Sequence, residues 1–321
     1  MSNQNKPDLT LESICCPVCK SCRAKFIFSR QDHSRMVSKY SFPVVQCEEC
    51  GMGYLQQRPT QETMPVFYPK SFYIANKARY VTDTISDRKL KMVTQFTEKG
   101  SLLDIGCAGG EFVDYASKDK WDAHGYEWSD LPDSTCSDRI LHGRIQEAYS
   151  NRQFDVLTAW AVLEHALNLE ELMTEAVKRL RPGGLFVSLV TNFDSIPGRW
   201  MQQDDIPRHV NLFTPKSLSL LLEQHGLEPI SWDYGNSIYS GSHRGMLVFL
   251  VKRLLGESMD SIVAQHRQPG RRKEFCDMLH GKPSRLIYYL SRLDNKLAPT
   301  IDAIATRLRR GMIMTCIAKK K

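Results

Sequence analysis

The chain has 321 residues, of which 42% are hydrophobic and 25% are charged, and it carries a formal net charge of +7. This length predicts two or three domains, and the composition excludes a disordered, collagenous or coiled-coil chain. No apolar run approaches the roughly 18 residues that span a membrane, and the polar N-terminus lacks the apolar core of a signal peptide. We therefore expect a cytoplasmic protein.

The first 50 residues contain six of the ten cysteines. Two Cys-x-x-Cys pairs, separated by 27 residues, have the spacing of a four-cysteine zinc ribbon. In a reducing compartment such clusters are more often metal ligands than disulfides. We predict a structural zinc site in a ribbon over residues 1–58, serving as a folding staple, with ligands Cys16, Cys19, Cys47 and Cys50.

Because of two further cysteines, the sequence leaves open which cysteines bind the metal. Cys22 also forms a Cys-x-x-Cys pair with Cys19, and Cys15 stands beside Cys16. We prefer Cys16 with Cys19, because Pro17 preforms the turn between them.

Helices and strands alternate from residue 82, after a connector over residues 59–81. This rhythm predicts an α/β fold with a parallel, doubly wound sheet in residues 82–239 plus 309–321. A basic helical insert, residues 240–308, precedes the last strand, residues 312–317, which we expect at the sheet edge. The other expected helices are 83–97, 111–118, 169–180 and 215–225, and the strands are 101–105, 123–127, 140–142, 154–161, 185–190 and 228–232, with a turn at 181–184.

A glycine-rich turn, residues 106–110, follows the first of these strands. It does not fit the dinucleotide fingerprint, which would need glycine at 108 and glycine or alanine at 111, where Ala108 and Glu111 stand. No Gly-Lys-Ser/Thr follows, so a phosphate-binding P-loop is excluded as well. Asp104, at the end of the strand, suits a cationic or amine-bearing ligand better than a pyrophosphate.

The next strand ends at Glu127, 17 residues beyond Gly110. An acidic side chain at this position can accept hydrogen bonds from both hydroxyls of a ribose. The competing interpretation is an ordinary charged residue at a strand end.

Four segments in order, LLDIGCAGG, GYE, FDVLTAWAVLEHA and RLRPGGLFVSLV, resemble the motifs of class I S-adenosylmethionine-dependent methyltransferases. The resemblance covers about residues 100–235 and implies a Rossmann-like methyltransferase fold that binds S-adenosyl-L-methionine. It further implies that Glu127 holds the ribose, that Trp128 flanks the adenine and that Trp160 lies beside the reactive methyl group. The loop around the methionine part would be formed by Asp104, Gly106, Ala108 and Gly110.

Two positions depart from the pattern of the family. Ala108 replaces the usual middle glycine, and Gln146 or a backbone group stands where an aspartate often contacts the adenine amine. A narrower resemblance, carried by CEECGMGY, FYPKSFY, WAVLEH and IPRHVNLFTPKSL, is to a bacterial subfamily that joins a zinc ribbon to this fold. Its members are often associated with modification of sugars, surface polysaccharides or secondary metabolites.

Methyl transfer to oxygen needs in-line alignment and a general base. His165 follows the fourth strand and His209 follows the fifth, both at the edge of the sheet where ligands bind, so they are our candidate catalytic residues. Each can instead be a hydrogen-bonded structural histidine. Ala161 replaces the first glutamate of the Glu-x-x-Glu-His metal site of some related enzymes, so we expect no metal in the active site.

Residues from 240 onward hold 17 Lys and Arg against 6 Asp and Glu, a net of +11, which leaves −4 for the rest of the chain. Basic amphipathic helices here can form a lid over the acceptor pocket, lie on an anionic membrane or contact a lipid-linked substrate. Binding to RNA is a further possibility.

These observations predict a methyltransferase for a hydroxyl group of a sugar-containing or other small metabolite, or a glycan acceptor. The alternatives are an rRNA or tRNA methyltransferase, a C-methyltransferase of a nucleotide-linked sugar, and a binding protein that has kept the fold without catalysis. We expect it in the cytoplasm, with possible contact to the inner face of the membrane, and consider nucleic acid the less favoured partner.

Overall fold

The computed structural model describes residues 9–32, 37–68, 83–129, 137–195, 198, 205–235, 238–239, 243–257 and 285–321, and only the backbone of residues 285–287. Most of the connector expected at 59–81 lies outside these residues.

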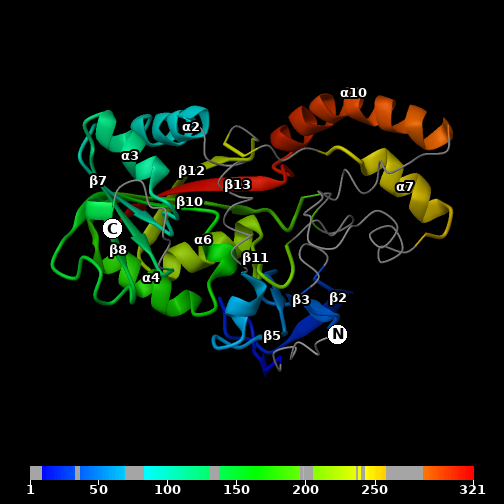
Figure 1. Cartoon of the computed structure of the whole chain (residues 1–321), viewed down its shortest axis with the longest axis horizontal. Coiled ribbons are helices and arrows are strands. Elements are labelled where there is room, and N and C mark those ends of the chain that lie inside the picture. Colours follow the sequence, from blue (N-terminus) through cyan, green and yellow to red (C-terminus); the bar gives the residue numbers. More distant parts are fainter. Residues whose placement is uncertain are drawn as a thin grey trace, which may run out of the picture.

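A seven-stranded sheet with the order β12-β13-β10-β9-β6-β7-β8 forms the centre of the molecule (Figure 1). The pairs between β8 and β10 are all parallel, and β13 runs antiparallel to both of its neighbours. The strands are β6 (Ser101–Ile105), β7 (Asp122–Glu127), β8 (Ile140–His142), β9 (Phe154–Trp160), β10 (Leu180–Thr191), β12 (Leu227–Asp233) and β13 (Ile313–Lys320).

Helices cover both faces of this sheet, because each helix carries one apolar stripe. Leu90 of α2 (Asp83–Thr94) and Phe112 of α3 (Glu111–Lys118) belong to the hydrophobic core on one face. Met173 of α4 (Leu169–Lys178) and Leu221 of α6 (Pro215–Gln224) belong to the core on the other. The predicted doubly wound α/β fold is confirmed.

Two expectations about the sheet were wrong. The last strand does not lie at the edge, because β13 is inserted between β10 and β12 and pairs with both over most of its length. The turn expected at residues 181–184 is an irregularity within β10, whose pairing with β9 shifts between Leu180 and Leu185. Gly183, with a φ of 76°, supplies the left-handed backbone needed there.

The N-terminal ribbon forms a second sheet with the order β11-β4-β3-β2. β2 (Ala24–Arg30), β3 (Phe42–Cys47) and β4 (Gly53–Leu55) come from the ribbon, whereas β11 (Asn211–Leu212) comes from the segment between β10 and α6. β1 (Leu11–Ser13) pairs separately with β5 (Gln57–Pro59), which precedes η1 (Met64–Phe67). The ribbon and the α/β domain therefore share one sheet.

Among the described residues between β12 and β13, two helices sit beside each other away from the ribbon (Figure 1). α7 (Met246–Leu254) packs against α10 (Arg285–Arg307), a long helix that carries Pro299 in its interior. Within the described residues, no helix is long and apolar enough to cross a bilayer.

Candidate active site

The glycine turn after β6 has three residues in left-handed conformation, Gly106 (φ 67°), Ala108 (φ 51°) and Gly110 (φ 83°). A Cβ atom on Gly106 would lie 2.7 Å from a methyl group of Val162 and 3.2 Å from the ring of Trp128. Glycine is therefore required at 106, and Ala108 adopts a conformation that L-residues other than glycine adopt at a cost.

Asp104 lies at the carboxyl end of β6 and is almost completely buried. Its Oδ1 accepts a hydrogen bond of 2.6 Å from the hydroxyl of Thr158 on the neighbouring β9. Burial raises the pKa of Asp104 to about 6, and the charge of Lys89 opposes this rise. A buried carboxyl group of this kind is suited to a cationic ligand.

Glu127 occupies the corresponding position at the end of β7. The backbone nitrogen of Ala108 donates to its Oε2 (2.9 Å), and that of Ser129 donates to its Oε1 (3.1 Å). Burial raises the pKa of Glu127 to about 7, although both hydrogen bonds favour the ionised form. The glycine turn and Glu127 are thus connected directly by a hydrogen bond.

The remaining predicted cofactor residues differ in how close they lie to this turn. The indole of Trp128 is 47% exposed and lies beside Gly106. Trp160 is buried at the end of β9 and packs edge-on against Phe112. The amide of Gln146 donates to Glu171 on α4, so the structure directs it toward that helix.

One residue near the turn was missed by the sequence analysis. Lys89 of α2 is 9% exposed, and its Nζ lies 5.3 to 5.4 Å from the ring centroids of Phe112, Trp160 and Tyr239. Among the described residues its ammonium has no hydrogen-bond acceptor. The signal in the sequence was a lysine on the apolar stripe of α2, next to Leu90 and four residues before Val93.

The structure brings the two candidate catalytic histidines together. His165, in η3 (Leu163–His165), and His209, from the loop before β11, have ring centroids 4.7 Å apart in an edge-to-face arrangement. Nδ1 of His165 lies 3.1 Å from the backbone oxygen of Arg208, which can only accept, so we assign the proton to Nδ1. Burial, followed by the proximity of His209, lowers the pKa of His165 to about 3, so it remains neutral with a lone pair on Nε2.

Hydrogen bonds of the backbone and of one side chain hold the loops that carry His165 and His209 next to each other. The amide of Asn211 donates to the backbone oxygens of Leu163 (2.9 Å) and Ala166 (2.7 Å), and Val210 N donates to Glu164 O (2.9 Å). Because Asn211 also begins β11, the same residues attach the histidine loops to the ribbon sheet.

A buried arginine adds a second attachment to the ribbon. Arg208 is fully buried and donates to both carboxylate oxygens of Asp205 (2.8 and 2.9 Å), to Oδ1 of Asp32 (2.9 Å) and to the backbone oxygen of Phe67 (3.1 Å). Asp32 follows β2 of the ribbon and is itself buried. Charged residues are seldom buried unless they are paired, and sequence alone does not show this pair, which spans 176 positions.

Glu164 joins the two histidines in a compact group. One ligand atom from each of Glu164, His165 and His209 lies within 4.8 Å of the others, a distance that permits a shared metal ion. The sequence analysis expected no metal here, because it considered only the positions next to Ala161 in the chain. The structure adds His209 from a different loop.

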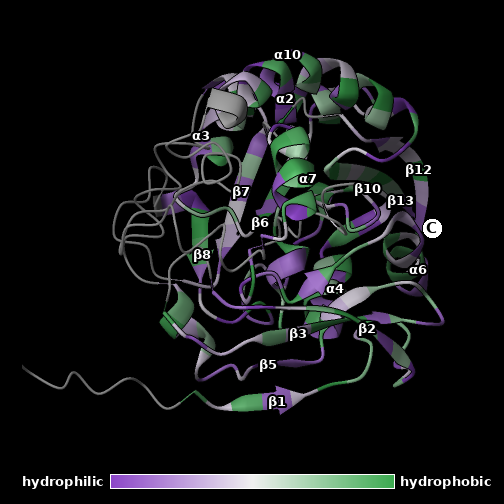
Figure 2. Ribbon diagram, turned by 90° about the vertical axis from the view of Figure 1, so that its right-hand side faces the viewer, coloured by the Kyte–Doolittle hydropathy of each residue, from purple (hydrophilic) through white to green (hydrophobic). Residues whose placement is uncertain are grey.

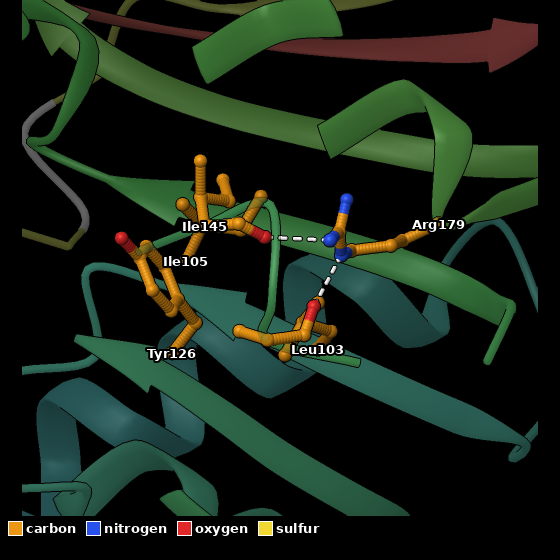
Figure 3. A pocket seen from close by; sticks show the side chains of 6 residues that line it. Leu103, Ile105, Tyr126, Ile145 and Arg179 are labelled. Atoms are coloured by element: carbon orange, nitrogen blue, oxygen red, sulfur yellow. Dashed lines mark hydrogen bonds between the residues drawn. The ribbon is translucent and has the colours of Figure 1, made fainter. Parts of the chain in front are cut away.

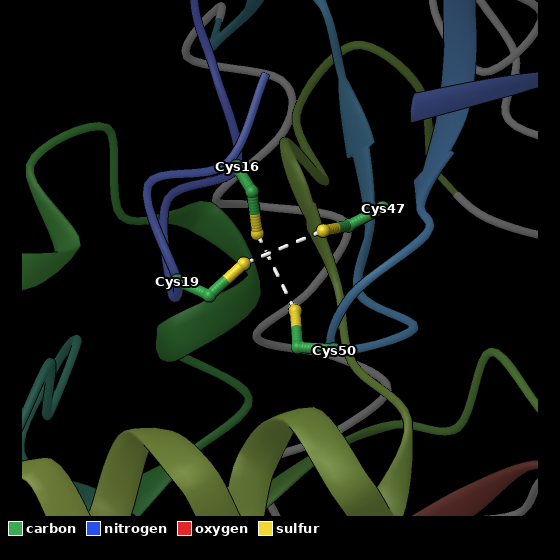
Figure 4. Close-up of side chains that lie close together, drawn as sticks. All are labelled: Cys16, Cys19, Cys47 and Cys50. Atoms are coloured by element: carbon green, nitrogen blue, oxygen red, sulfur yellow. Dashed lines mark hydrogen bonds between the residues drawn. The ribbon is translucent and has the colours of Figure 1, made fainter. Parts of the chain in front are cut away.

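The four predicted zinc ligands converge between the two Cys-x-x-Cys turns of the ribbon, which we call its knuckles (Figure 4). The sulfur of Cys16 lies 3.5 Å from that of Cys50, and the sulfur of Cys19 lies 3.4 Å from that of Cys47. The hydrogen bond from Cys16 lowers the pKa of the Cys50 thiol to about 5 and raises that of Cys16. Four thiols packed at such distances without disulfides have the donor set and spacing of a tetrahedral zinc site.

The preferred cysteine register is confirmed. Cys15 and Cys22 form a disulfide with each other, so neither belongs to the four-cysteine group. This disulfide was not expected, because the cysteine cluster as a whole was interpreted as metal ligands. Gly51, with a φ of 77°, follows Cys50 and supplies a left-handed backbone conformation that glycine adopts readily.

A small gap in the packing lies on the other face of the central sheet and is not part of the site around the glycine turn. Leu103, Ile105, Tyr126, Ile145, Ala148 and Arg179 line it (Figure 3). The guanidinium of Arg179 is bonded to the backbone oxygens of Ile145 and Ala148, both at 2.5 Å, and to Glu175. With its one charged group already bonded and its other walls mostly apolar, the gap is part of the core packing.

The chain is similar in sequence to known methyltransferases. A family model described as "Methyltransferase domain" matches residues 78–231. The mitochondrial ubiquinone biosynthesis O-methyltransferase of Saccharomyces cerevisiae is 27% identical over 198 residues, which cover 56% of this chain and 62% of the relative. A ubiquinone biosynthesis O-methyltransferase of Rickettsia bellii is 24% identical over 100 residues, or 28% of this chain and 42% of the relative. The chain thus spans about two to three fifths of the length of these curated relatives.

Similar solved structures include a SAM-dependent methyltransferase from Archaeoglobus fulgidus, with 15% identity and a TM-score of 0.48 over 78% of this chain and 99% of that one. Another is phosphoethanolamine N-methyltransferase 2 of Haemonchus contortus, with 14% identity and a TM-score of 0.45 over 83% of this chain and 62% of that one.

The family model runs from residue 78, before α2, to residue 231 in β12, and the four ordered motifs, at residues 102–190, lie within it. The glycine turn, Asp104 and Glu127 lie within this range, and the turn is hydrogen-bonded to Glu127. Residues 78–231 thus match a methyltransferase domain, and the ribbon that precedes them in the chain carries a group of four cysteines suited to a metal ion.

Proposed function

We propose that the protein transfers the methyl group of S-adenosylmethionine to a hydroxyl oxygen of a small, sugar-containing or other metabolite. The observation that carries the proposal is the pair of buried carboxyl groups, Asp104 and Glu127, at the ends of adjacent strands, with the glycine turn bonded to Glu127. Ligands of doubly wound sheets bind at this edge.

The described residues divide the work of holding the cofactor. Glu127 accepts hydrogen bonds from the ribose hydroxyls, and Trp128 packs against the adenine beside Gly106. Lys89 binds the carboxylate of the methionine part, since its buried ammonium lacks an acceptor among the described residues. Asp104 faces the ammonium of the same ligand.

Transfer breaks the bond between sulfur and methyl carbon and forms a bond between that carbon and the acceptor oxygen, whose proton must be removed. His209 is the proposed base. His165 stays neutral and orients it, because a pKa of about 3 makes His165 itself a poor proton acceptor. The name of the yeast relative, an O-methyltransferase, supports oxygen as the acceptor atom.

The first experiment is a calorimetric titration of the purified protein with S-adenosylhomocysteine, with NADH as the control ligand. We expect binding of the first alone, at micromolar concentration. Binding of NADH, or of neither ligand, would remove the cofactor assignment.

The acceptor is then sought by transfer of radioactive methyl groups to a panel of sugars, nucleotide-linked sugars and phenols. His209→Asn should abolish transfer and leave S-adenosylhomocysteine binding unchanged. Because Glu164, His165 and His209 can share a metal ion, the assay is repeated with added Mg²⁺ and Mn²⁺. Transfer to RNA in place of small acceptors would favour the alternative of an RNA methyltransferase.

A further inference from the structure

Exposed apolar side chains gather on one part of the molecule. Of the fourteen large hydrophobic side chains that are exposed among the described residues, nine lie on α7, on α10 or directly after them. Hydrophobic and hydrophilic residues alternate along α10 in Figure 2, whereas α7 is mostly hydrophobic. The nine are Leu250, Leu254, Leu255, Tyr288, Tyr289, Leu293, Leu297, Ile304 and Leu308.

α10 is anchored by a different face from the one that carries these residues. Asp294, Ala298 and Ala305 are buried, at spacings of four and seven residues that place them on one side of the helix. The carboxylate of Asp294 accepts hydrogen bonds from the backbone nitrogens of Gly245 and Leu247 at the start of α7. The two helices are therefore fixed to each other, and the orientation of α10 is defined.

The exposed apolar residues of α10 form a stripe. Leu293, Leu297, Ile304 and Leu308 also recur at four and seven residues, so they follow one line for about 22 Å. Arg292, Lys296 and Arg307, each one position before a member of this stripe, are exposed and form a parallel basic row. Apolar and basic side chains thus reach the solvent next to each other along the outer side of α10.

We infer that the outer side of α7 and α10 docks on the surface of an anionic phospholipid membrane. Helices that lie in a membrane interface insert leucine and aromatic side chains at the acyl boundary while neighbouring Lys and Arg contact lipid phosphates. The net charge of +11 from residue 240 onward complements such a surface, whereas the remainder of the chain, at −4, does not. RNA would match the basic row but would leave the leucines in water.

The test is flotation of the full-length protein with vesicles. We expect it to float with vesicles that contain phosphatidylglycerol, less in high salt, and hardly at all with pure phosphatidylcholine. Leu293→Ser combined with Leu297→Ser should reduce the bound fraction at least about tenfold. Phe26→Ser is the matched control, because Phe26 is 59% exposed but lies on the ribbon.

The charged row is tested in the same way. Lys296→Glu combined with Arg307→Glu should reduce binding by a similar factor, whereas Lys25→Glu with Lys120→Glu, which changes the net charge equally, should leave most of it. Failure of the native protein to float, or equal losses in the controls, would overturn the inference.

A second copy of the chain is the competing occupant of this surface. If the leucine variants turn a dimer into a monomer in light scattering while the native protein ignores vesicles, the surface is a self-association interface and the membrane inference is wrong. Binding of S-adenosylhomocysteine, measured on every variant, separates these outcomes from failure of the proposed function. Thermal melting shows whether each variant is folded.

Discussion

The guanidinium of Arg208 and the carboxylate of Asp32 lie 2.9 Å apart, both completely buried, although 176 residues separate them. Arg208 adjoins His209, and Asp32 belongs to the ribbon. The ion pair therefore connects the ribbon to the loop that carries the proposed base.

This pair predicts a large loss of stability on removal of the arginine. Arg208→Met would remove the guanidinium that pairs with the carboxylates of Asp32 and Asp205, and we expect the free energy of unfolding to fall by about 3 to 5 kcal/mol. Denaturant unfolding measures the change. Lys118→Met, which breaks an exposed pair with Asp114, is the control and should change stability by less than about 1 kcal/mol.

The metal site predicts about one zinc per chain. Cys47→Ser should abolish zinc in elemental analysis and lower the melting temperature, because metal binding contributes to folding. The matched control is Cys15→Ser with Cys22→Ser, which removes two neighbouring cysteines outside the group of four. This control should keep its zinc; loss of zinc there would show that the register is wrong.

The raised pKa of Glu127 predicts a pH-dependent stability. A folded-state pKa of about 7, against an ordinary value of 4.5, means that folding favours the protonated carboxyl group. Its contribution is fully present below about pH 4.5 and is lost as the pH rises to 7. Glu127→Gln should thus raise the free energy of unfolding at pH 8 by about 2 to 3 kcal/mol and change it little at pH 4.

The same variant should bind S-adenosylhomocysteine more weakly, since the ribose loses its acceptor. Glu147→Gln, at an exposed glutamate, is the control for both measurements. A Glu127→Gln protein with no extra stability at pH 8 would contradict the burial argument.

The proposed role of Lys89 is tested by comparing the affinities for two ligands, one with a carboxylate and one without. Lys89→Met keeps the apolar stem but removes the charge, so the affinity for S-adenosylhomocysteine should fall about tenfold or more. Affinity for methylthioadenosine, which lacks the carboxylate, should stay the same. Lys91→Met, at an exposed lysine of α2, should affect neither ligand. Equal losses for both ligands in Lys89→Met would indicate a structural role instead.

The left-handed backbone at Ala108 predicts that replacement of alanine by glycine, which usually lowers stability, does not lower it here. Ala108→Gly relieves the left-handed conformation of residue 108, so stability should stay constant or rise by up to about 1 kcal/mol. Ala303→Gly, at an exposed position within α10, should instead lower stability by about 1 kcal/mol. Calorimetric melting of both variants gives the comparison.

Local patterns predicted most of the fold. The helix Glu111–Lys118 and the strand Ser101–Ile105 have the expected bounds, because their apolar periods and the glycine turn between them are local signals. The place of β13 was predicted wrongly, since sheet order depends on contacts between distant segments.

The same distinction between local signals and distant contacts applies to the residues of the candidate site. The four cysteines were predicted from their spacing, and Asp104 and Glu127 from their places at strand ends in the resembling motifs; the cofactor roles of these two carboxyl groups stay predictions. Lys89 and Arg208 were missed, because a lone lysine or arginine is normally a solvated residue and only the folded structure shows what buries it.

The pairing of β11 with β4 has a consequence for how the chain folds during synthesis. The knuckles of the ribbon can close soon after residue 50 leaves the ribosome, but β4 must wait roughly 150 residues for its partner, on the order of ten seconds or more at usual rates of translation. For that time β4 is an open edge strand, prone to pairing with other chains. An N-terminal fragment cut before residue 205 would keep that edge permanently, so we expect the ribbon expressed alone to aggregate even when loaded with zinc.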